Sequence, residues 1–127
     1  MRETAKVTLA LLAGIGIGAV MISAGTAQTA AKQAYIVAEM HVTDPAGFTE
    51  YMRGEPATLT SYHGRVVARA LPDMREGTPA DGMVTIYAFA SAEAANRWYS
   101  SPEYAKLLPL RQHSATSRVY FLDGVVQ

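Results

Sequence analysis

The sequence predicts a small α+β domain whose elements follow the order strand, helix, strand, strand, helix, strand. Three observations lead to this fold class. Four short segments are rich in strand-forming residues, apolar residues recur at helical spacing between them, and stretches of Gly, Pro and Asp separate the elements. The chain has 127 residues and no internal repeats, so one domain accounts for everything after its N-terminal segment.

The N-terminal segment has the layout of a secretory signal. Two basic residues precede an apolar run over residues 7–22, and small, weakly polar residues follow. Gly25 and Ala27 satisfy the small-x-small rule of signal peptidases, which predicts a signal peptide over residues 1–27. Cleavage elsewhere between residues 24 and 31 is the alternative.

A competing interpretation is an uncleaved membrane anchor, because the apolar segment approaches the roughly 20 residues that a spanning helix needs. In that case the membrane would be a partner through this segment alone. On both interpretations the folded domain, assigned to residues 33–127, is exported, and we expect it to be periplasmic or secreted.

The first predicted strand covers residues 34–42, AYIVAEMHV, and ends before a Thr-Asp-Pro turn. Asp44 is expected to cap the first helix, and Pro45 fits its first position. Apolar residues at a spacing of 3.6 residues continue this helix. Gly64 is expected to supply the left-handed residue at which the helix ends.

The middle of the chain contains the second predicted strand, over residues 64–71, and the third, over residues 83–90. Residues 72–82 between them are dense in Pro, Gly and Asp, and they are expected to form a loop.

Ser91 is expected to cap the second helix over residues 92–99, and Pro102 restarts it as far as residue 113. The last strand is predicted over residues 117–125. This order is the ferredoxin-like split βαβ pattern, which predicts a βαββαβ domain with a four-stranded antiparallel sheet.

The segment WYSSPEYAKLLPLR, residues 98–111, is the most aromatic part of the second helix. Aromatic residues at helical spacing most often pack a core, which favours an architectural role. The alternative is that Tyr99, Tyr104 or Arg111 lines a pocket.

A family resemblance is carried by AYIVAEMHVTDPAGFTEYM, YHGRVVAR, YAFASAEAANRWYSSPEYAKLLPLRQHSA and the DGV ending, over residues 34–125. These segments resemble the domain of unknown function 1330 family, which belongs to the dimeric α/β barrel group. The chain departs from the family pattern at His63, where such proteins tend to carry a second glycine. The resemblance implies two ferredoxin-like units whose sheets face each other to close a barrel, and it implies no activity.

Alternation along each predicted strand divides its residues into an apolar face and a mixed face. The apolar faces, expected under the helices, hold Ile36, Ala38, Met40, Val42, Val66, Ala68, Ala70, Val84, Ile86, Ala88, Val119 and Phe121. The mixed faces hold Tyr35, Val37, Glu39, His41, Arg65, Val67, Arg69, Thr85, Tyr87, Phe89, Arg118, Tyr120 and Leu122. The mixed set carries too much apolar surface for a soluble monomer to expose, so it predicts half of a homodimer interface.

The polar members of the mixed set are the candidate ligand-binding residues: Arg69, Tyr87, Glu39, His41, Arg65 and Arg118. Glu39 and His41 could form an acid/base pair. Arg69 and Tyr87 could hold a carboxylate through the guanidinium fork and a phenol donor. The structural alternative is that Glu39 neutralises Arg69 or Arg65 in a buried network, and no catalytic residue is assigned.

Composition excludes several classes of function. The chain has no cysteine, which excludes thiol catalysis, thiolate metal sites and iron–sulfur clusters. Neither His63, expected at a helix end, nor the lone helical His113 has the spacing of a zinc site, so no metal or cofactor is predicted. Residues 28–127 carry nine basic and ten acidic side chains, and this near-neutral balance excludes nucleic acid as a partner.

Three functions remain open from the sequence. The leading one is a small exported homodimer that binds a compact anionic or aromatic molecule without a metal ion. The second is a cofactor-independent monooxygenase or isomerase, of a kind that the dimeric α/β barrel group contains, using His41, Glu39 or Tyr87 for proton transfer. The third is a purely structural homodimer.

Overall fold

The computed structural model describes residues 32–126, so the predicted signal segment and its cleavage site lie outside the described residues. Within this part the order of elements is β1 (Ala34–Val42), α1 (Pro45–Ser61), β2 (Arg65–Ala70), β3 (Met83–Phe89), α2 (Ala92–Tyr99), α3 (Pro102–Ser114) and β4 (Ala115–Asp123). The predicted βαββαβ order is confirmed, with the second helix divided into α2 and α3. The last strand begins two residues earlier than the sequence predicts.

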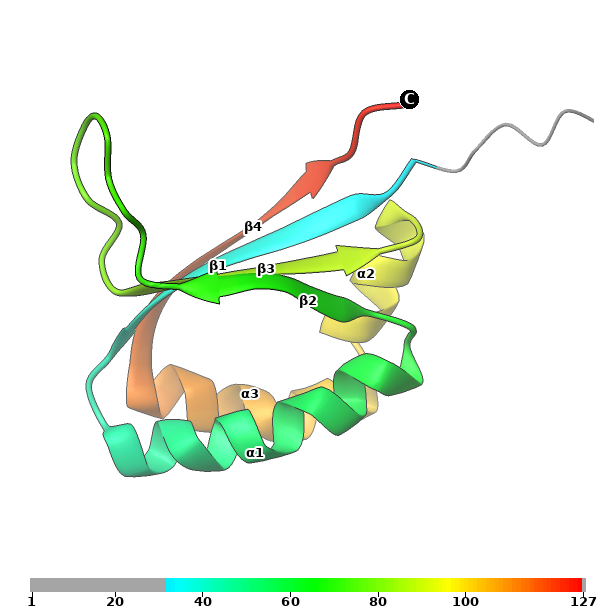
Figure 1. The fold of residues 1–127 in the computed structure, drawn as a ribbon. Helices are drawn as coiled ribbons and strands as arrows, with labels where there is room; N and C mark the ends of the chain where they lie inside the picture. The colour runs from blue at the N-terminus through cyan, green and yellow to red at the C-terminus, as the bar shows by residue number, and fades with distance from the viewer. Residues whose placement is uncertain (1–31, 127) are drawn as a thin grey trace, which may run out of the picture.

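The four strands form one antiparallel sheet in the order β2-β3-β1-β4. Figure 1 shows α1 and α3 side by side along one face of this sheet, with α2 at one end. The other face, called the open face below, carries no helix, and the loop of residues 71–82 rises beside it. No helix among residues 32–126 is long and apolar enough to cross a membrane.

The starts of the helices follow the local sequence closely. The Ser91 hydroxyl accepts a hydrogen bond from the backbone N–H of Ala94 at 3.1 Å, and the Ser101 hydroxyl accepts one from Tyr104 at 3.1 Å. Asp44 occupies the N-cap of α1 in an extended conformation, but its side chain makes no capping hydrogen bond. Proline in the first turn therefore contributes to this helix start where the expected side-chain cap does not.

The end of α1 differs from the prediction. His63, and not Gly64, adopts the left-handed conformation, with a φ of 57°. Gly64 is required for another reason: a Cβ atom there would lie 2.5 Å from both Leu59 Cδ1 and Phe89 Cε1. Because glycine has no side chain, the turn can pack closely on the core. Gly64 is therefore required for space and not for a left-handed backbone conformation.

The aromatic segment of α2 and α3 lies in the core between the helices and the sheet. The Trp98 side chain is 1% exposed, and its ring centroid lies 4.3 Å from that of Tyr104 and 5.2 Å from that of Tyr87. Its indole N–H donates to the Thr58 hydroxyl at 3.1 Å. This packing confirms the architectural interpretation of Trp98 and Tyr104.

The predicted phase of β3 is wrong. In the register, Ile36 of the helix-covered face pairs with Tyr87, and Ala38 pairs with Thr85, so Tyr87 and Thr85 lie under the helices. Val84, Ile86 and Ala88 lie on the open face instead. Both faces of β3 are apolar, so alternation alone does not show which one the helices cover; the bulky rings occupy the deeper layer.

The predicted phase of β2 is wrong over its second half, because a β-bulge lies between Val66 and Ala68. Beyond this irregularity Arg69 pairs with Thr85 on the helix-covered side, while Ala68 pairs with Ile86 on the open face. One extra residue reverses the direction of every later side chain in a strand. The bulge therefore moves Arg69 from the predicted mixed face to the side where α1 packs.

Candidate functional site

The structure divides the six predicted site residues among separate places in the fold. Arg69 and Tyr87 lie on the helix-covered side, and Glu39 and Arg118 lie on the open face. His41 and Arg65 also have register positions on the open face, as predicted, but both are exposed, and Arg65 forms no ion pair within the described part of the chain. The expected single cluster is therefore not formed.

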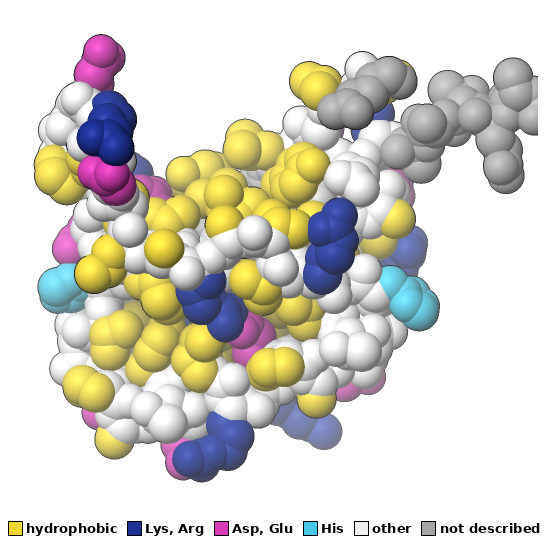
Figure 2. Space-filling model, in the orientation of Figure 1, with side chains coloured by type: hydrophobic (Ala, Val, Ile, Leu, Met, Phe, Trp, Pro, Cys, Tyr) yellow, Lys and Arg dark blue, Asp and Glu magenta, His cyan; other side chains and the backbone are white. Residues whose placement is uncertain are grey.

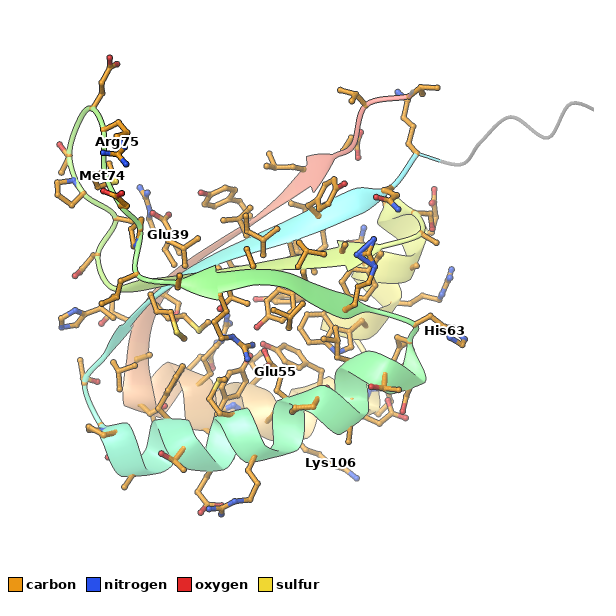
Figure 3. The ribbon with its side chains drawn as sticks, in the orientation of Figure 1. Glu39, Glu55, His63, Met74, Arg75 and Lys106 are labelled. Carbon is orange, nitrogen blue, oxygen red and sulfur yellow. The ribbon has the colours of Figure 1, made fainter. Side chains whose placement is uncertain are left out.

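Glu55 on α1 is the partner of Arg69, and the sequence analysis missed it. Its Oε2 atom accepts a hydrogen bond from Arg69 Nη2 at 2.6 Å, and its Oε1 atom accepts bonds from the Tyr87 hydroxyl and, at 3.2 Å, from the Tyr51 hydroxyl. Figure 3 shows Glu55 between α1 and the sheet. The position was detectable, because Tyr51, Glu55 and Leu59 fall at i, i+4 and i+8 on the buried stripe of α1.

The buried cluster extends from Glu55 through two more pairs. The hydroxyls of Tyr51 and Tyr104 lie 3.0 Å apart, and Arg69 Nε donates to the Thr85 hydroxyl at 3.2 Å. Burial raises the pKa of Tyr51 and of Tyr87 far above the ordinary value, and nearby ionisable groups add to this effect. The phenols therefore stay protonated as donors, and every member of the cluster has a partner, as in a structural network.

The open face contains a different ion pair, between Glu39 of β1 and Arg118 of β4. The two residues are direct cross-strand partners, and Arg118 donates through Nε at 2.8 Å and through Nη2 at 3.0 Å. The Glu39 side chain is 9% exposed, whereas that of Arg118 is 77% exposed. The expectation that Glu39 neutralises Arg69 or Arg65 is wrong, because Arg69 points to the other side of the sheet and Arg65 forms no ion pair with Glu39, whose partner is Arg118.

His41 does not form an acid/base pair with Glu39. Its Nδ1 atom lies 2.9 Å from Oδ1 of Asp81, in the loop before β3, and both side chains are largely exposed. Among residues 32–126 there is no group of three or more His, Cys, Asp and Glu side chains that could hold a metal ion.

A cleft of about 620 Å³ lies between the open face and the loop before β3. Glu39, Arg118 and Asp81 contribute its charged groups, and Met74 and Pro79 contribute apolar surface. Figure 3 shows Glu39 beneath the loop that carries Met74 and Arg75. The arrangement can hold a compact molecule with its apolar part against the loop and a polar group near the Glu39–Arg118 pair.

The rest of the open face is apolar. Figure 2 shows hydrophobic side chains gathered on the upper surface, between the raised loop and the C-terminal end. Tyr120 and Leu122 of β4 are 43% and 50% exposed, and they flank the half-buried and buried side chains of Tyr35 and Val37 on β1. The cleft is thus continuous with a broad apolar surface that no element of the described chain covers.

Comparisons with known proteins agree with this fold. A family model described as "Domain of unknown function (DUF1330)" matches residues 33–125. The RPA0582 protein of unknown function from Rhodopseudomonas palustris is similar, with a TM-score of 0.59, 18% identity, and coverage of 74% of this chain and 83% of that one. SnoaB, a cofactor-independent oxygenase from Streptomyces nogalater, has a TM-score of 0.57, 19% identity, and coverage of 76% of this chain and 97% of that one. No curated protein matches the chain. At these identities the likeness to solved structures shows the ferredoxin-like fold alone.

Proposed function

Since the chain belongs to the DUF1330 family, which has no assigned activity, we propose from its geometry that it is a homodimer that binds a small molecule without a metal ion. The two open faces would lie against each other, and the ligand would occupy the cleft beside the Glu39–Arg118 pair. The observation that carries this proposal is the continuity of the cleft with the apolar open face.

The dimer is supported by the character of the open face. Tyr120 and Leu122 expose large apolar side chains on the same face as Ile86, and the Glu39–Arg118 ion pair lies beside them, between β1 and the edge strand β4. A contiguous apolar face of this kind is typical of an interaction surface. A second copy is the partner that fits it best. In a two-fold dimer the apolar patch of one protomer packs on the same patch of its partner, and the Glu39–Arg118 pair lies at the rim of the interface.

The ligand is supported by the size and lining of the cleft. Its volume of about 620 Å³ lies within the range of small-molecule sites. Arg118 uses two of its N–H donors on Glu39, and a guanidinium has five, so donors remain for an anionic group of the ligand. We therefore propose a compact ligand with an apolar or aromatic body against Met74 and an anionic or polar group near Arg118.

An enzyme is the second candidate, of the cofactor-independent oxygenase or isomerase class. The specific observation in its favour is that two carboxylates, Glu39 and Asp81, line the cleft, where one could move a proton to or from a bound molecule. Tyr87, one of the residues predicted for proton transfer, lies in the buried Glu55 cluster and not in this cleft. His41 is held by Asp81 and could assist from the cleft's edge.

Export is proposed from the sequence of residues 1–27 and from nothing else. N-terminal sequencing of the protein from its native envelope should return a first residue between 25 and 32. An intact Met1 would favour the membrane-anchored alternative.

Native mass spectrometry of the protein, purified without denaturant, tests the function directly. We expect the mass of two chains with a small molecule retained, and we expect Arg118→Met to lose that molecule while remaining dimeric. A monomer without retained ligand would contradict the proposal. Oxygen consumption on a quinol-type substrate without added cofactor would instead support the enzyme, and a ligand-free dimer would support the purely structural function.

A further inference from the structure

A second cavity, of about 300 Å³, lies near the free edge of β4 and the C-terminal part of α3. It is lined by Tyr99, Arg111, Gln112, Ala115, Ser117 and Val119. Ser117 and Val119 pair with Met40 and Ala38 of the helix-covered face, so this cavity and the open-face cleft lie on opposite sides of the sheet. Ser117 also lines the open-face cleft, whereas Arg111 lines this cavity and not the cleft.

Arg111 is the unusual member of this lining, because its charge is buried without a counterion. The residue is 4% exposed, and none of its nitrogen atoms lies within ion-pair distance of a carboxylate of residues 32–126. Nη2 donates to the Tyr99 hydroxyl at 3.3 Å, and the guanidinium carbon lies 6.0 Å from the centre of the Tyr99 ring. The buried Nε atom has no hydrogen-bond partner.

Ser117 adds a second unsatisfied group at the same cavity. Its Oγ atom is buried and has no hydrogen-bond partner in the structure. These two atoms, Arg111 Nε and Ser117 Oγ, are the buried side-chain nitrogen and oxygen atoms without a partner in the described chain. Burying a guanidinium without an anion is costly, and native proteins seldom leave such groups unpaired. Arg111 lines the cavity, so an anionic group bound there could balance its charge.

We propose that this cavity is a binding site for a small organic carboxylate. The carboxylate would lie against the Arg111 guanidinium, and the apolar part of the ligand would contact Tyr99 and Val119. One guanidinium balances one negative charge, which favours a monocarboxylate. The cavity volume lies at the lower limit of ligand pockets, which favours a molecule of a few carbon atoms.

Thermal unfolding with simple carboxylates as probes tests this site. Acetate, butyrate and benzoate are added to the purified protein at constant ionic strength, with butyramide and benzamide as uncharged controls. We expect at least one carboxylate to raise Tm with a saturable dependence on concentration, and the amides to leave it unchanged. Equal effects of acids and amides, or no effect of any acid, would overturn the proposal.

Single variants show whether the carboxylates bind at Arg111. Arg111→Met should weaken carboxylate binding by about tenfold or more, because the charged group that holds the carboxylate is lost. Arg97→Met removes an exposed arginine from the neighbouring helix α2 and should bind as the wild type does. Retained binding in Arg111→Met would assign the ligand to another place.

The Tm of Arg111→Met without added ligand shows whether Arg111 is unpaired in the free protein or already pairs with a carboxylate of a second copy. Removal of an unpaired buried charge should leave Tm unchanged or raise it. A fall in Tm together with dissociation of a dimer would mean that a carboxylate of the second copy already pairs with Arg111, and the proposal would be wrong. Ligand retention in the open-face cleft is measured separately with Arg118→Met, so either proposal can fail alone.

Discussion

Arg69 on β2 and Glu55 on α1 form an ion pair in which Nη2 and Oε2 lie 2.6 Å apart. The pair joins the edge strand of the sheet to the helix that covers it. The Glu55 carboxylate also accepts from Tyr87 of β3, so one buried side chain connects three elements. This contact depends on the bulge in β2, which directs Arg69 toward the helices.

Loss of Arg69 should therefore destabilise the fold. Arg69→Met leaves a buried carboxylate unpaired, and we expect the free energy of unfolding to fall by about 3 kcal/mol. The lower end of the usual range applies because the Arg69 side chain is 25% exposed. Urea-induced unfolding measures this change. Arg65→Met, an exposed arginine on the same strand, is the matched control and should change stability by less than about 0.5 kcal/mol.

A double variant shows whether Glu55 is the partner that matters. Arg69→Met combined with Glu55→Gln removes both charges, keeps an acceptor for the phenols, and should recover much of the lost stability. Arg69→Met combined with Glu39→Gln should recover none, because Glu39 lies on the other face. Equal recovery in the two double variants would contradict the assignment.

Substitution on the open face should disrupt the proposed dimer. Leu122→Asp places an unpaired charge in the interface, and light scattering should then give the mass of one chain. Leu110→Asp, at an exposed residue of α3, is the control and should remain dimeric. Tyr87→Asp is unsuitable for this test although the sequence places Tyr87 on the mixed face, because Tyr87 is buried in the core and the variant should not fold.

High pH should unfold the protein through its buried tyrosines. Burial is the main cause that raises the pKa of Tyr51, Tyr87 and Tyr104, so the folded chain keeps their protons. The unfolded chain loses them above about pH 10, where it binds fewer protons than the folded chain. Stability is therefore retained below that pH and falls above it, by about 1.4 kcal/mol per pH unit for each tyrosine.

The pH dependence of urea-induced unfolding measures this effect. In Tyr51→Phe the free energy of unfolding should fall less steeply with pH above about pH 10, because one tyrosine fewer contributes to the fall. A free energy of unfolding that stays constant between about pH 9 and pH 11 would show that the phenols are not the groups responsible.

Two neighbouring residues at the end of α1 should respond in opposite directions. His63→Gly relieves a left-handed backbone conformation and should raise stability by up to about 1 kcal/mol. Gly64→Ala forces a methyl group against Leu59 and Phe89 and should lower stability by about 1 to 3 kcal/mol. Urea-induced unfolding of both variants checks the pair, and a gain for Gly64→Ala would contradict the steric argument.

Strand alternation could not predict which of the six candidate residues would lie together. The six predicted residues were grouped by strand alternation, which gives the period of a strand but not the side that a helix will cover. In β1 and β4 polar residues mark the open side, and the predicted Glu39 and Arg118 do share a face. In β3 both sides are apolar, and Tyr87 was placed on the wrong one.

The sequence by itself determined the order of elements, because each one depends on neighbours along the chain. Ser91, Ser101 and Pro102 fix helix starts through contacts within a few residues, and apolar spacing fixes the helices and strands between them. Tertiary structure alone decided which residues meet. A single bulge in β2 brings Arg69 to Glu55, and packing of α3 on the sheet buries Arg111 without a counterion. These contacts join residues distant in sequence, and their geometry depends on how whole elements pack, which no local pattern encodes.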